Sequence, residues 1–163
     1  MIPTAYVWSP HGWFALKGTE YGLQSVCLQE DMKTPPTADV PPFLAEAVRQ
    51  LSEYFAGNRQ VFRLKLDWSG TPAFHQAVWE QLLMIPYGHT TSYKAIAEHL
   101  GDPKAVRAVG QANRRNPIAI IVPCHRVVAA NGDLQGYFYG LNVKRALLAH
   151  ENPTSFAEQG TLF

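Results

Sequence analysis

The feature that most constrains the fold of this chain is an apolar run, Ile118 to Val122, that ends at Pro123 and is followed by Cys124 and His125. A short apolar run of this length is typical of a buried strand. Proline has no backbone N–H and fixes its own φ, so it readily ends a strand. We therefore expect a buried strand over residues 118–122, with Cys124 held at the start of the turn that follows.

The pair Cys124-His125 has two interpretations. Cysteine reacts as its thiolate, and an adjacent imidazole is a common way to form a thiolate near neutral pH. A free cysteine is also among the most frequently buried residues, where it serves packing alone. The dipeptide by itself does not decide between a nucleophile and a structural cysteine.

Length and composition favour a folded, globular chain. Its 163 residues suit one domain or two small ones, and the 47% of hydrophobic residues argues against disorder. Cys27 and Cys124 are far apart, so neither a disulfide framework nor a cysteine-rich zinc site is expected. No window approaches the roughly 20 apolar residues of a membrane span, and the N-terminus lacks a secretion signal. We expect a soluble, cytoplasmic protein.

Residues 1–70 predict a small unit of strands and one helix. Apolar alternation and turn residues indicate the strands, and a helical apolar spacing that ends at Gly57-Asn58 indicates the helix. The expected elements are strands over residues 6–8, 13–16, 23–28 and 61–66, a proline-rich loop over residues 31–42 and a helix over residues 43–55. Residues 67–71 are the expected boundary with a second unit, residues 71–163, which opens with Thr71 as N-cap and Pro72 at the first position of a helix.

The second unit contains a pattern typical of a helix-turn-helix. Short helices are expected over residues 92–100 and 102–113, with a glycine-containing turn between them. The second would be the recognition helix, with Lys104, Arg107 and Arg114 on its exposed side. Helix pairs of this kind also occur as plain packing units.

Basic residues gather in the segment from His89 to Arg126. It holds six basic residues against Glu98 and Asp102, which gives a net charge of +4. The six are Lys94, Lys104, Arg107, Arg114, Arg115 and Arg126. Such a cluster is a footprint for phosphate, although a solvated charged face would look the same.

Several motifs in the second unit stand together in one order and spacing. They are Ile85-Pro86-Tyr87-Gly88, Ser92-Tyr93, Ala105-Val106-Arg107-Ala108-Val109-Gly110, Asn116-Pro117, Pro123-Cys124-His125-Arg126-Val127 and Leu147-Leu148-Ala149-His150-Glu151. From about Thr71 to Glu151 the chain closely resembles the methylated-DNA–protein-cysteine methyltransferases, which repair O6-alkylguanine directly. Ser9-Pro10-His11-Gly12 and Tyr54-Phe55-Ala56-Gly57 extend a weaker resemblance to the first unit.

The resemblance implies a fold and an activity. The fold is α+β or α/β, with a ribonuclease-H-like small sheet and helix in residues 1–70 and a helical, helix-turn-helix DNA-binding domain in residues 71–163. The activity is transfer of an alkyl group from O6-methylguanine, and also from O4-methylthymine, in double-stranded DNA to the protein's own cysteine. The transfer is irreversible and happens once per molecule. A monomer without a cofactor is implied.

The resemblance also implies a role for each matching residue. Cys124 would accept the alkyl group, His125 would act as its base through a water molecule, and Glu151 would orient the imidazole. Asn116 would brace this network, and Tyr93 would offer its hydroxyl to the leaving guanine. The other implied residues are Arg107, Ala105, Ala108, Lys104, Arg114 and Ser92 at the DNA, and Pro123, Tyr137, Phe138 and Tyr139 around the alkyl group.

The target base has to rotate out of the duplex, since a thiol cannot reach an adduct among stacked bases. Arg107 would enter the stack in its place, from a helix in the minor groove that small Ala105 and Ala108 let approach closely. Taken singly, Glu151 is an ordinary helix-end residue, Tyr93 a core tyrosine, Arg107 a phosphate contact and Ser92 a helix cap.

Two departures from the family pattern affect the expectations. Phe138-Tyr139 stands where many relatives have small residues, so the alkyl pocket would be narrower. Some relatives bind zinc in the first domain, but Cys27 and His11 do not rebuild such a site, and we expect no metal. Rival functions are a damage-binding protein without transfer, which would lack the acceptor Cys124, and a regulatory helix-turn-helix protein, for which no ligand-sensing unit is evident.

The chain ends in Gln159-Gly160-Thr161-Leu162-Phe163. Leu162 and Phe163 either fold back on their own domain or, with Gln159, form a short peptide that resembles those binding the bacterial sliding clamp.

Overall fold

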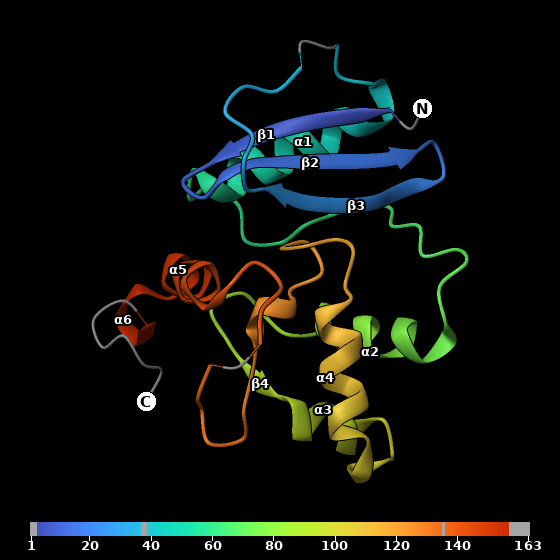
Figure 1. Cartoon of the computed structure of the whole chain (residues 1–163), viewed down its shortest axis with the longest axis vertical. Helices are drawn as coiled ribbons and strands as arrows, with labels where there is room; N and C mark the ends of the chain where they lie inside the picture. Colours follow the sequence, from blue (N-terminus) through green and yellow to red (C-terminus); the bar gives the residue numbers. More distant parts are fainter. Residues whose placement is uncertain (1–2, 37–38, 135, 157–163) are drawn as a thin grey trace. The chain divides into compact units, whose positions relative to one another are not determined.

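The computed structural model describes residues 3–36, 39–134 and 136–156 (Figure 1). The chain forms two compact units. The first holds the chain up to Ser69 together with Pro117–Ile121, and the second holds Gly70–Asn116 and the chain from Val122 onward. Within the described ranges, every helix is too short or too polar to cross a membrane.

The first unit is a three-stranded antiparallel sheet covered by one helix. The strands β1 (Thr4–Ser9), β2 (Gly12–Thr19) and β3 (Gly22–Gln29) pair in chain order. At the β2–β3 turn Gly22 has a φ of 147°, and an added Cβ would lie 2.9 Å from the backbone of Leu66. Only glycine fits there, because the chain needs both the unusual φ and the close backbone approach.

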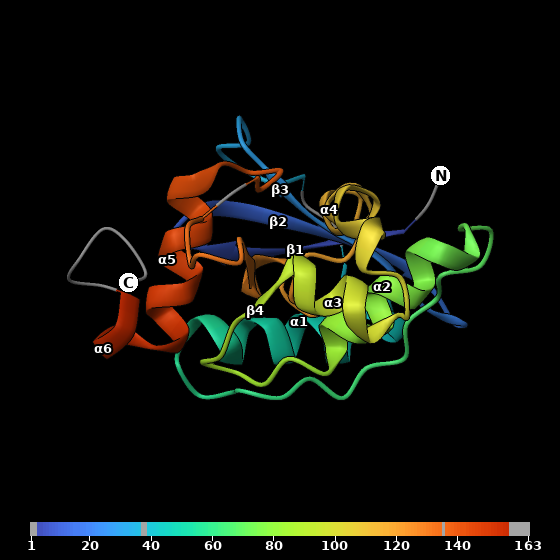
Figure 2. The same ribbon diagram turned by 90° about the horizontal axis from the view of Figure 1, so that it is seen from below.

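Helix α1 (Pro42–Phe55) lies along one face of this sheet (Figures 1 and 2). Its buried apolar residues recur at helical spacing: Leu44, Ala47, Leu51 and Tyr54. The expected helix end is confirmed. The Gly57 N–H donates to Tyr54 O and the Asn58 N–H to Glu53 O, with Gly57 at a φ of 81°, which is a Schellman motif.

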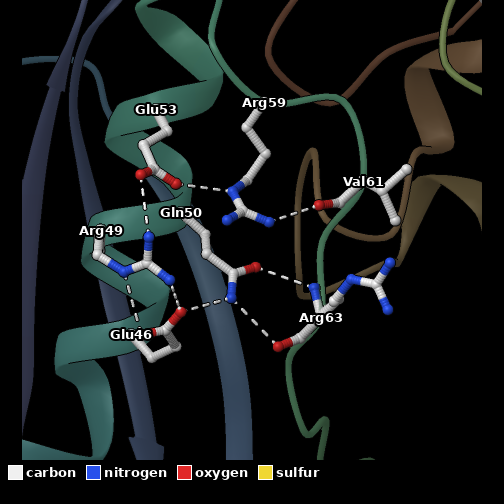
Figure 3. A network of polar contacts seen from close by, with 7 residues as sticks. All are labelled: Glu46, Arg49, Gln50, Glu53, Arg59, Val61 and Arg63. Carbon is white, nitrogen blue, oxygen red and sulfur yellow. Dashed lines mark hydrogen bonds and ion pairs between the residues drawn. The ribbon is translucent and has the colours of Figure 1, made fainter.

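The expected strand over residues 61–66 is wrong for all but its last residue. Leu66 makes an isolated bridge to Leu23, and the rest of the segment is not in a sheet. The side chain of Gln50 hydrogen bonds to both backbone groups of Arg63 (Figure 3). It accepts from the Arg63 N–H (2.9 Å) and donates to the Arg63 carbonyl (3.2 Å). A side chain thus supplies hydrogen bonds that a neighbouring strand would otherwise make.

Gln50 belongs to a wider polar network on α1 (Figure 3). Arg49 pairs with Glu46 and Glu53, and Arg59 pairs with Glu53 at 2.8 Å. Arg49 is more than half exposed, whereas Gln50 is 2% exposed. Arg49 therefore makes exposed ion pairs, whereas the adjacent Gln50 makes buried hydrogen bonds.

We expect Gln50→Ala to lower the free energy of unfolding by about 1–3 kcal/mol, because it removes both bonds to Arg63 and leaves space in a packed site. Arg49→Ala is the matched control and should change it by less than about 1 kcal/mol, since exposed ion pairs contribute little. Urea denaturation of both variants measures the difference. If both variants lowered the free energy of unfolding equally, the bonds from Gln50 to Arg63 would have no special role in stability.

The second unit is mainly helical. Its elements are α2 (Ala73–Leu83), β4 (Thr91–Ser92), α3 (Tyr93–His99), η1 (Pro103–Ala105), α4 (Val106–Arg114), η2 (Cys124–Arg126), β5 (Val127–Val128), α5 (Leu141–Glu151) and α6 (Pro153–Phe156). Strands β4 and β5 pair in parallel. The expected cap at Thr71 is one residue early, because α2 has Pro72 in the N-cap position.

Helices α3 and α4 lie side by side as a helix-turn-helix (Figure 1). Ser92 caps α3 by accepting from the Ala95 N–H, as expected. A second Schellman motif, through Gly101 at a φ of 86°, ends α3, and Asp102 then caps the next turn by accepting from the Lys104 N–H. Local signals alone account for this break.

The expected strand over residues 118–122 is also wrong. These residues are buried, but only Ile118 is bridged, to Val26 of β3. The Ile121 N–H then donates to Ala119 O with Ile120 at a φ of 71°, and the Cys124 N–H donates to Val122 O around Pro123. Two tight γ-type turns replace the strand, and the first holds a β-branched residue in a conformation that such residues rarely adopt.

Candidate active site

Cys124 is the first residue of η2 and is 6% exposed. Two asparagines at and after the end of α4 fix the backbone around it. The side chain of Asn113 donates to Cys124 O (3.2 Å) and that of Asn116 donates to Val122 O (2.7 Å). Asn116 also hydrogen bonds to the Cys124 thiol group. The cysteine is therefore held in one position, as expected from the turn after Pro123.

His125 and Glu151 form a buried pair next to this cysteine. His125 Nε2 lies 2.7 Å from Glu151 Oε2, and Glu151 is the last residue of α5. Because Glu151 can only accept when ionised, Nε2 carries the proton of the neutral ring and Nδ1 is the free acceptor. Nδ1 is buried and bonds to no other group among the described residues.

Arg126 joins His125 and Glu151, and the three side chains form a buried cluster. Its guanidinium donates to both carboxylate oxygens of Glu151, at 2.7 and 3.1 Å, and to Ile85 O at 2.7 Å. The sequence placed Arg126 among the basic residues that face phosphate, and this is wrong because the side chain is buried and paired. The basic footprint is the five exposed residues Lys94, Lys104, Arg107, Arg114 and Arg115.

The electrostatics keep Cys124 and His125 uncharged at rest. Burial alone would raise the pKa of Glu151, but His125 and Arg126 outweigh it and hold that pKa well below the usual range. Burial lowers the pKa of His125, against the effect of Glu151. Burial also raises the pKa of the Cys124 thiol, although Asn116 and Lys144 act to lower it. The resting pair is thus a thiol and a neutral imidazole.

Two tyrosines lie within electrostatic range of Cys124. Burial and then the charge of a Cys124 thiolate raise the pKa of Tyr93 to about 12, and the same two causes raise the pKa of Tyr137 well above its usual value. Both phenols are therefore protonated donors near neutral pH. Tyr93 begins α3, while Tyr137 lies in the segment between β5 and α5.

The residues expected around the alkyl group are not equivalent. Pro123 and Tyr137 are buried, Tyr139 is half-buried with its ring 5.6 Å from that of Tyr137, and Phe138 is 68% exposed. Tyr137 is close enough to Cys124 for the thiolate charge to raise its pKa, whereas Phe138 is exposed to solvent. The narrower alkyl pocket expected from Phe138-Tyr139 stays a prediction.

The residues expected at DNA lie on the helix-turn-helix. Lys104, Arg107, Ala108 and Arg114 are exposed, and Ala105 is half-buried. Arg114 is close enough to Tyr93 to act on its pKa. The surface of η1 and α4 thus presents cations beside two small residues.

Sequence reasoning missed Lys144 and Asn113. Lys144 is fully buried, and its ammonium donates to Val127 O at 2.6 Å and to the Tyr93 hydroxyl at 3.5 Å. A signal existed, because Lys144 shares the buried face of α5 with Leu147, Leu148 and Glu151 at helical spacing. Asn113 carried no comparable local signal.

Across residues 3–36, 39–134 and 136–156, no group of three His, Cys, Asp or Glu side chains gathers as a metal site would. The expectation of no metal stays a prediction.

Gln159, Leu162 and Phe163, the residues of the expected clamp-binding peptide, lie outside the described residues.

Both units match models of known protein families. The model described as "6-O-methylguanine DNA methyltransferase, ribonuclease-like domain" matches residues 3–68, and the model described as "6-O-methylguanine DNA methyltransferase, DNA binding domain" matches residues 73–153. The expected two-part fold, a small sheet domain followed by a helical DNA-binding domain, is confirmed.

Whole-length relatives agree with these matches. The chain is 50% identical to a methylated-DNA–protein-cysteine methyltransferase of Methanosarcina acetivorans over 88% of this chain and 94% of that one. It is 47% identical to that of Mycobacterium bovis over 100% and 99%. The crystal structure of the O6-methylguanine methyltransferase of Mycobacterium tuberculosis is similar with a TM-score of 0.82 at 47% identity, covering 94% of each chain.

A crystal structure of the Mycobacterium tuberculosis protein in complex with DNA is similar to the same degree, with a TM-score of 0.82 at 45% identity over 93% of this chain and 94% of that one. The family models span both units, and the relatives cover nearly the whole chain. The chain therefore belongs to the methylated-DNA–protein-cysteine methyltransferase family.

Proposed function

We propose that this protein repairs O6-alkylguanine in double-stranded DNA by moving the alkyl group onto Cys124. The observation that carries the proposal is the buried thiol beside a His125–Glu151 hydrogen bond of 2.7 Å, on a helix-turn-helix unit. The Mycobacterium tuberculosis relative solved in complex with DNA supports DNA as the partner. A soft thiolate is the best nucleophile in this site for displacement at an alkyl carbon.

His125 takes the thiol proton on Nδ1, the ring nitrogen left free by the bond from Nε2 to Glu151. A bridging water carries the proton between Sγ and Nδ1. Glu151 stabilises the imidazolium that forms, as in a nucleophile, base and acid arrangement. Arg126 holds the carboxylate in place through two hydrogen bonds.

The thiolate then attacks the alkyl carbon. The Sγ–C bond forms, the C–O6 bond breaks, and the electron pair leaves with guanine. The hydroxyl of Tyr93 donates to the departing base and stabilises its charge, which a protonated phenol can do. The product is a thioether, which has no route back to a thiol, so each molecule acts once.

Mass spectrometry tests the assignment. The protein is incubated with an oligonucleotide duplex that contains O6-methylguanine and is then digested. A methyl group on the peptide that contains Cys124 is the expected result. An unmodified Cys124 together with tight binding to the duplex would favour the rival function, damage binding without transfer. The same assay with O4-methylthymine tests the second proposed substrate.

The rival functions have less support. A damage-binding protein without transfer needs no acceptor, yet Cys124 is present beside a His125–Glu151 hydrogen bond. The whole-length relatives are named as methyltransferases, not as regulators. We propose further that the protein acts as a monomer in the cytoplasm, without a cofactor.

Arg107 is proposed to support extrusion of the target nucleotide. It is exposed on α4, and extrusion costs roughly a few kcal/mol in duplex DNA but nothing for a free base. Arg107→Ala should therefore slow methyl transfer from duplex DNA about tenfold to a hundredfold and leave the reaction with free O6-methylguanine unchanged.

Lys104→Ala is the matched control for Arg107, since it removes a nearby exposed charge without a proposed place in the stack. It should weaken binding to damaged and undamaged duplexes alike, in a salt-dependent way. Single-turnover rates on the two substrates measure the difference. If Arg107→Ala slowed both substrates equally, the extrusion role would be wrong.

The C-terminal peptide remains a proposal from the sequence. We propose that Gln159, Leu162 and Phe163 bind the sliding clamp of the same organism, with the two apolar side chains in its groove. A form that ends at Glu158 should lose the interaction in a pull-down with the purified clamp. If both forms bind equally, or neither binds, the peptide has no such role and a return to its own domain is favoured.

A further inference from the structure

A groove in the second unit is not used by the proposed transfer. Its volume is about 390 Å³, which falls in the range of about 300–1,000 Å³ that is usual for ligand pockets. It is lined by the end of α2, the segment that follows and helix α3, and its apolar side chains are Met84, Ile85, Pro86, Ala95 and Ile96. The rest of the lining is polar and contains no carboxylate. An apolar wall with a few polar groups is the usual composition of a binding surface.

Met84 leaves apolar surface open at this groove. It is 69% exposed, and no large apolar residue within 3–36, 39–134 and 136–156 is more exposed. A methionine side chain is flexible and adapts its shape to irregular apolar partners. Exposed apolar surface of this kind, next to a groove, is typical of an interaction site.

The described chain ends close to the groove. The segment that joins α2 to β4 passes the end of α5 (Figures 1 and 2). There the side chain of Asn152 donates to Gly88 O at 3.0 Å. Gly88 stands between Pro86 and His89 in the sequence, and both of these line the groove. Residues 157–163, the C-terminal tail, therefore begin a short distance from the groove, after the single turn of α6.

The tail has the length and the chemistry to occupy the groove. Its seven residues span at most about 25 Å when extended. Leu162 and Phe163 are its two large apolar residues, and Glu158 is its one acidic residue. His89 and His99 are the titratable side chains of the groove, so Glu158 meets no like charge there.

We propose that this groove binds the C-terminal tail of the same chain, with Leu162 and Phe163 against the apolar wall beside Met84. A short tether holds a segment at an effective concentration in the millimolar range, so that weak contacts are enough to keep it bound. The inference does not depend on alkyl transfer. It gives the two apolar tail residues a place in the free protein, from which a sliding clamp, if it binds them, has to displace them.

Methionine oxidation tests the proposal on the unsubstituted chain. Hydrogen peroxide converts an exposed methionine to its sulfoxide, and peptide mapping by mass spectrometry gives the rate at each position. Met84 should be oxidised about threefold or more slowly in the full chain than in a form that ends at Glu158, because the tail covers it. Met32, half-buried in the first unit, is the internal control and should react equally in both forms. Equal rates at Met84 would overturn the inference.

Disulfide trapping in the full chain shows which chain fills the groove, and it does not depend on the shortened form. All variants carry Cys27→Ser. The test variant adds Leu162→Cys and Ala95→Cys, and the control has Lys94→Cys in place of Ala95→Cys. Ala95 and Lys94 are neighbouring exposed residues of α3, but only Ala95 lines the groove.

Under a mild oxidant at low protein concentration, the test variant should close a disulfide within one chain about tenfold or more faster than the control. Equal rates would contradict the proposal. A disulfide that mainly joins two chains would also overturn it, because the occupant would then be the tail of a second copy.

A charge in the groove provides the last comparison. Met84→Glu, added to the test variant, should slow disulfide closure about tenfold, since it places a carboxylate in the apolar wall and repels Glu158. Leu83→Glu is the matched control, at the adjacent exposed residue that does not line the groove, and should leave the rate unchanged. An unchanged rate in Met84→Glu would count against the groove as the binding site. These measurements contain neither clamp nor DNA, so failure of the clamp proposal or of alkyl transfer is recognised separately.

Discussion

Cys124→Ser is expected to abolish methyl transfer, with a loss on the order of a thousandfold or more, while binding to the methylated duplex persists. A serine hydroxyl has a far higher pKa than a thiol and is a poorer nucleophile at carbon. The substitution also leaves the hydrogen bonds from Asn113 and Asn116 to the backbone in place, so the turn should survive. Loss of activity would then report on the sulfur and not on the fold.

The other cysteine offers the matched control for this experiment. Cys27 is half-buried in β3 of the first unit and is also a free thiol. Cys27→Ser should transfer the methyl group at the wild-type rate. The measurement is the methyl content of the duplex after single-turnover incubation, alongside the dissociation constant. A serine variant at position 124 that still cleared the lesion would refute the assignment of the acceptor.

Arg126→Met is expected to lower the free energy of unfolding by about 3–5 kcal/mol, the largest effect on stability that we predict. The substitution preserves most of the apolar volume but leaves the carboxylate of Glu151 buried without its guanidinium, and it also removes the donor to Ile85 O. Arg49→Ala is the control, since it removes an exposed arginine that makes two ion pairs. Urea denaturation compares the two.

A double variant separates the ion pair from packing. Arg126→Met with Glu151→Gln should recover part of the loss, because the remaining partner is no longer charged. The pH dependence has a defined sign. The pKa of Glu151 is lowered by folding, so its contribution is present above about 4.5 and is lost as the pH falls below that value. Absence of recovery in the double variant would show that packing, not charge, dominates at Arg126.

Local signals explain what the sequence predicted well. Glycines at 57 and 101 each end a helix in a Schellman motif, and Ser92 caps α3, because such contacts involve only neighbouring residues. The same holds for Cys124 after Pro123, where proline restricts the turn itself. Glu151 was predicted as a site residue only from the resemblance to a family, because no neighbouring residue indicates a function for it.

Distant contacts explain what the sequence did not predict. Arg126 pairs with a residue 25 positions later and with a carbonyl 41 positions earlier, so no local pattern distinguished it from the surface cations. The expected strand over residues 61–66 gave way to the side chain of Gln50. In both cases a single side chain from elsewhere in the fold decided the local structure.

The turns that lead to Cys124 affect when this part of the chain can fold during synthesis. The residues on either side of Ile118 pair with Val26: the Val26 N–H donates to Pro117 O (2.9 Å), and the Ala119 N–H donates to Val26 O (3.1 Å). Ile120 adopts a φ of 71°, which β-branched residues rarely do, and long-range pairing of this kind forms slowly. The segment Pro117–Ile121 is therefore held by a strand that leaves the ribosome long before it. A fragment beginning at residue 70 would contain Cys124, His125 and Glu151, yet its segment Pro117–Ile121 would lack the partner strand β3.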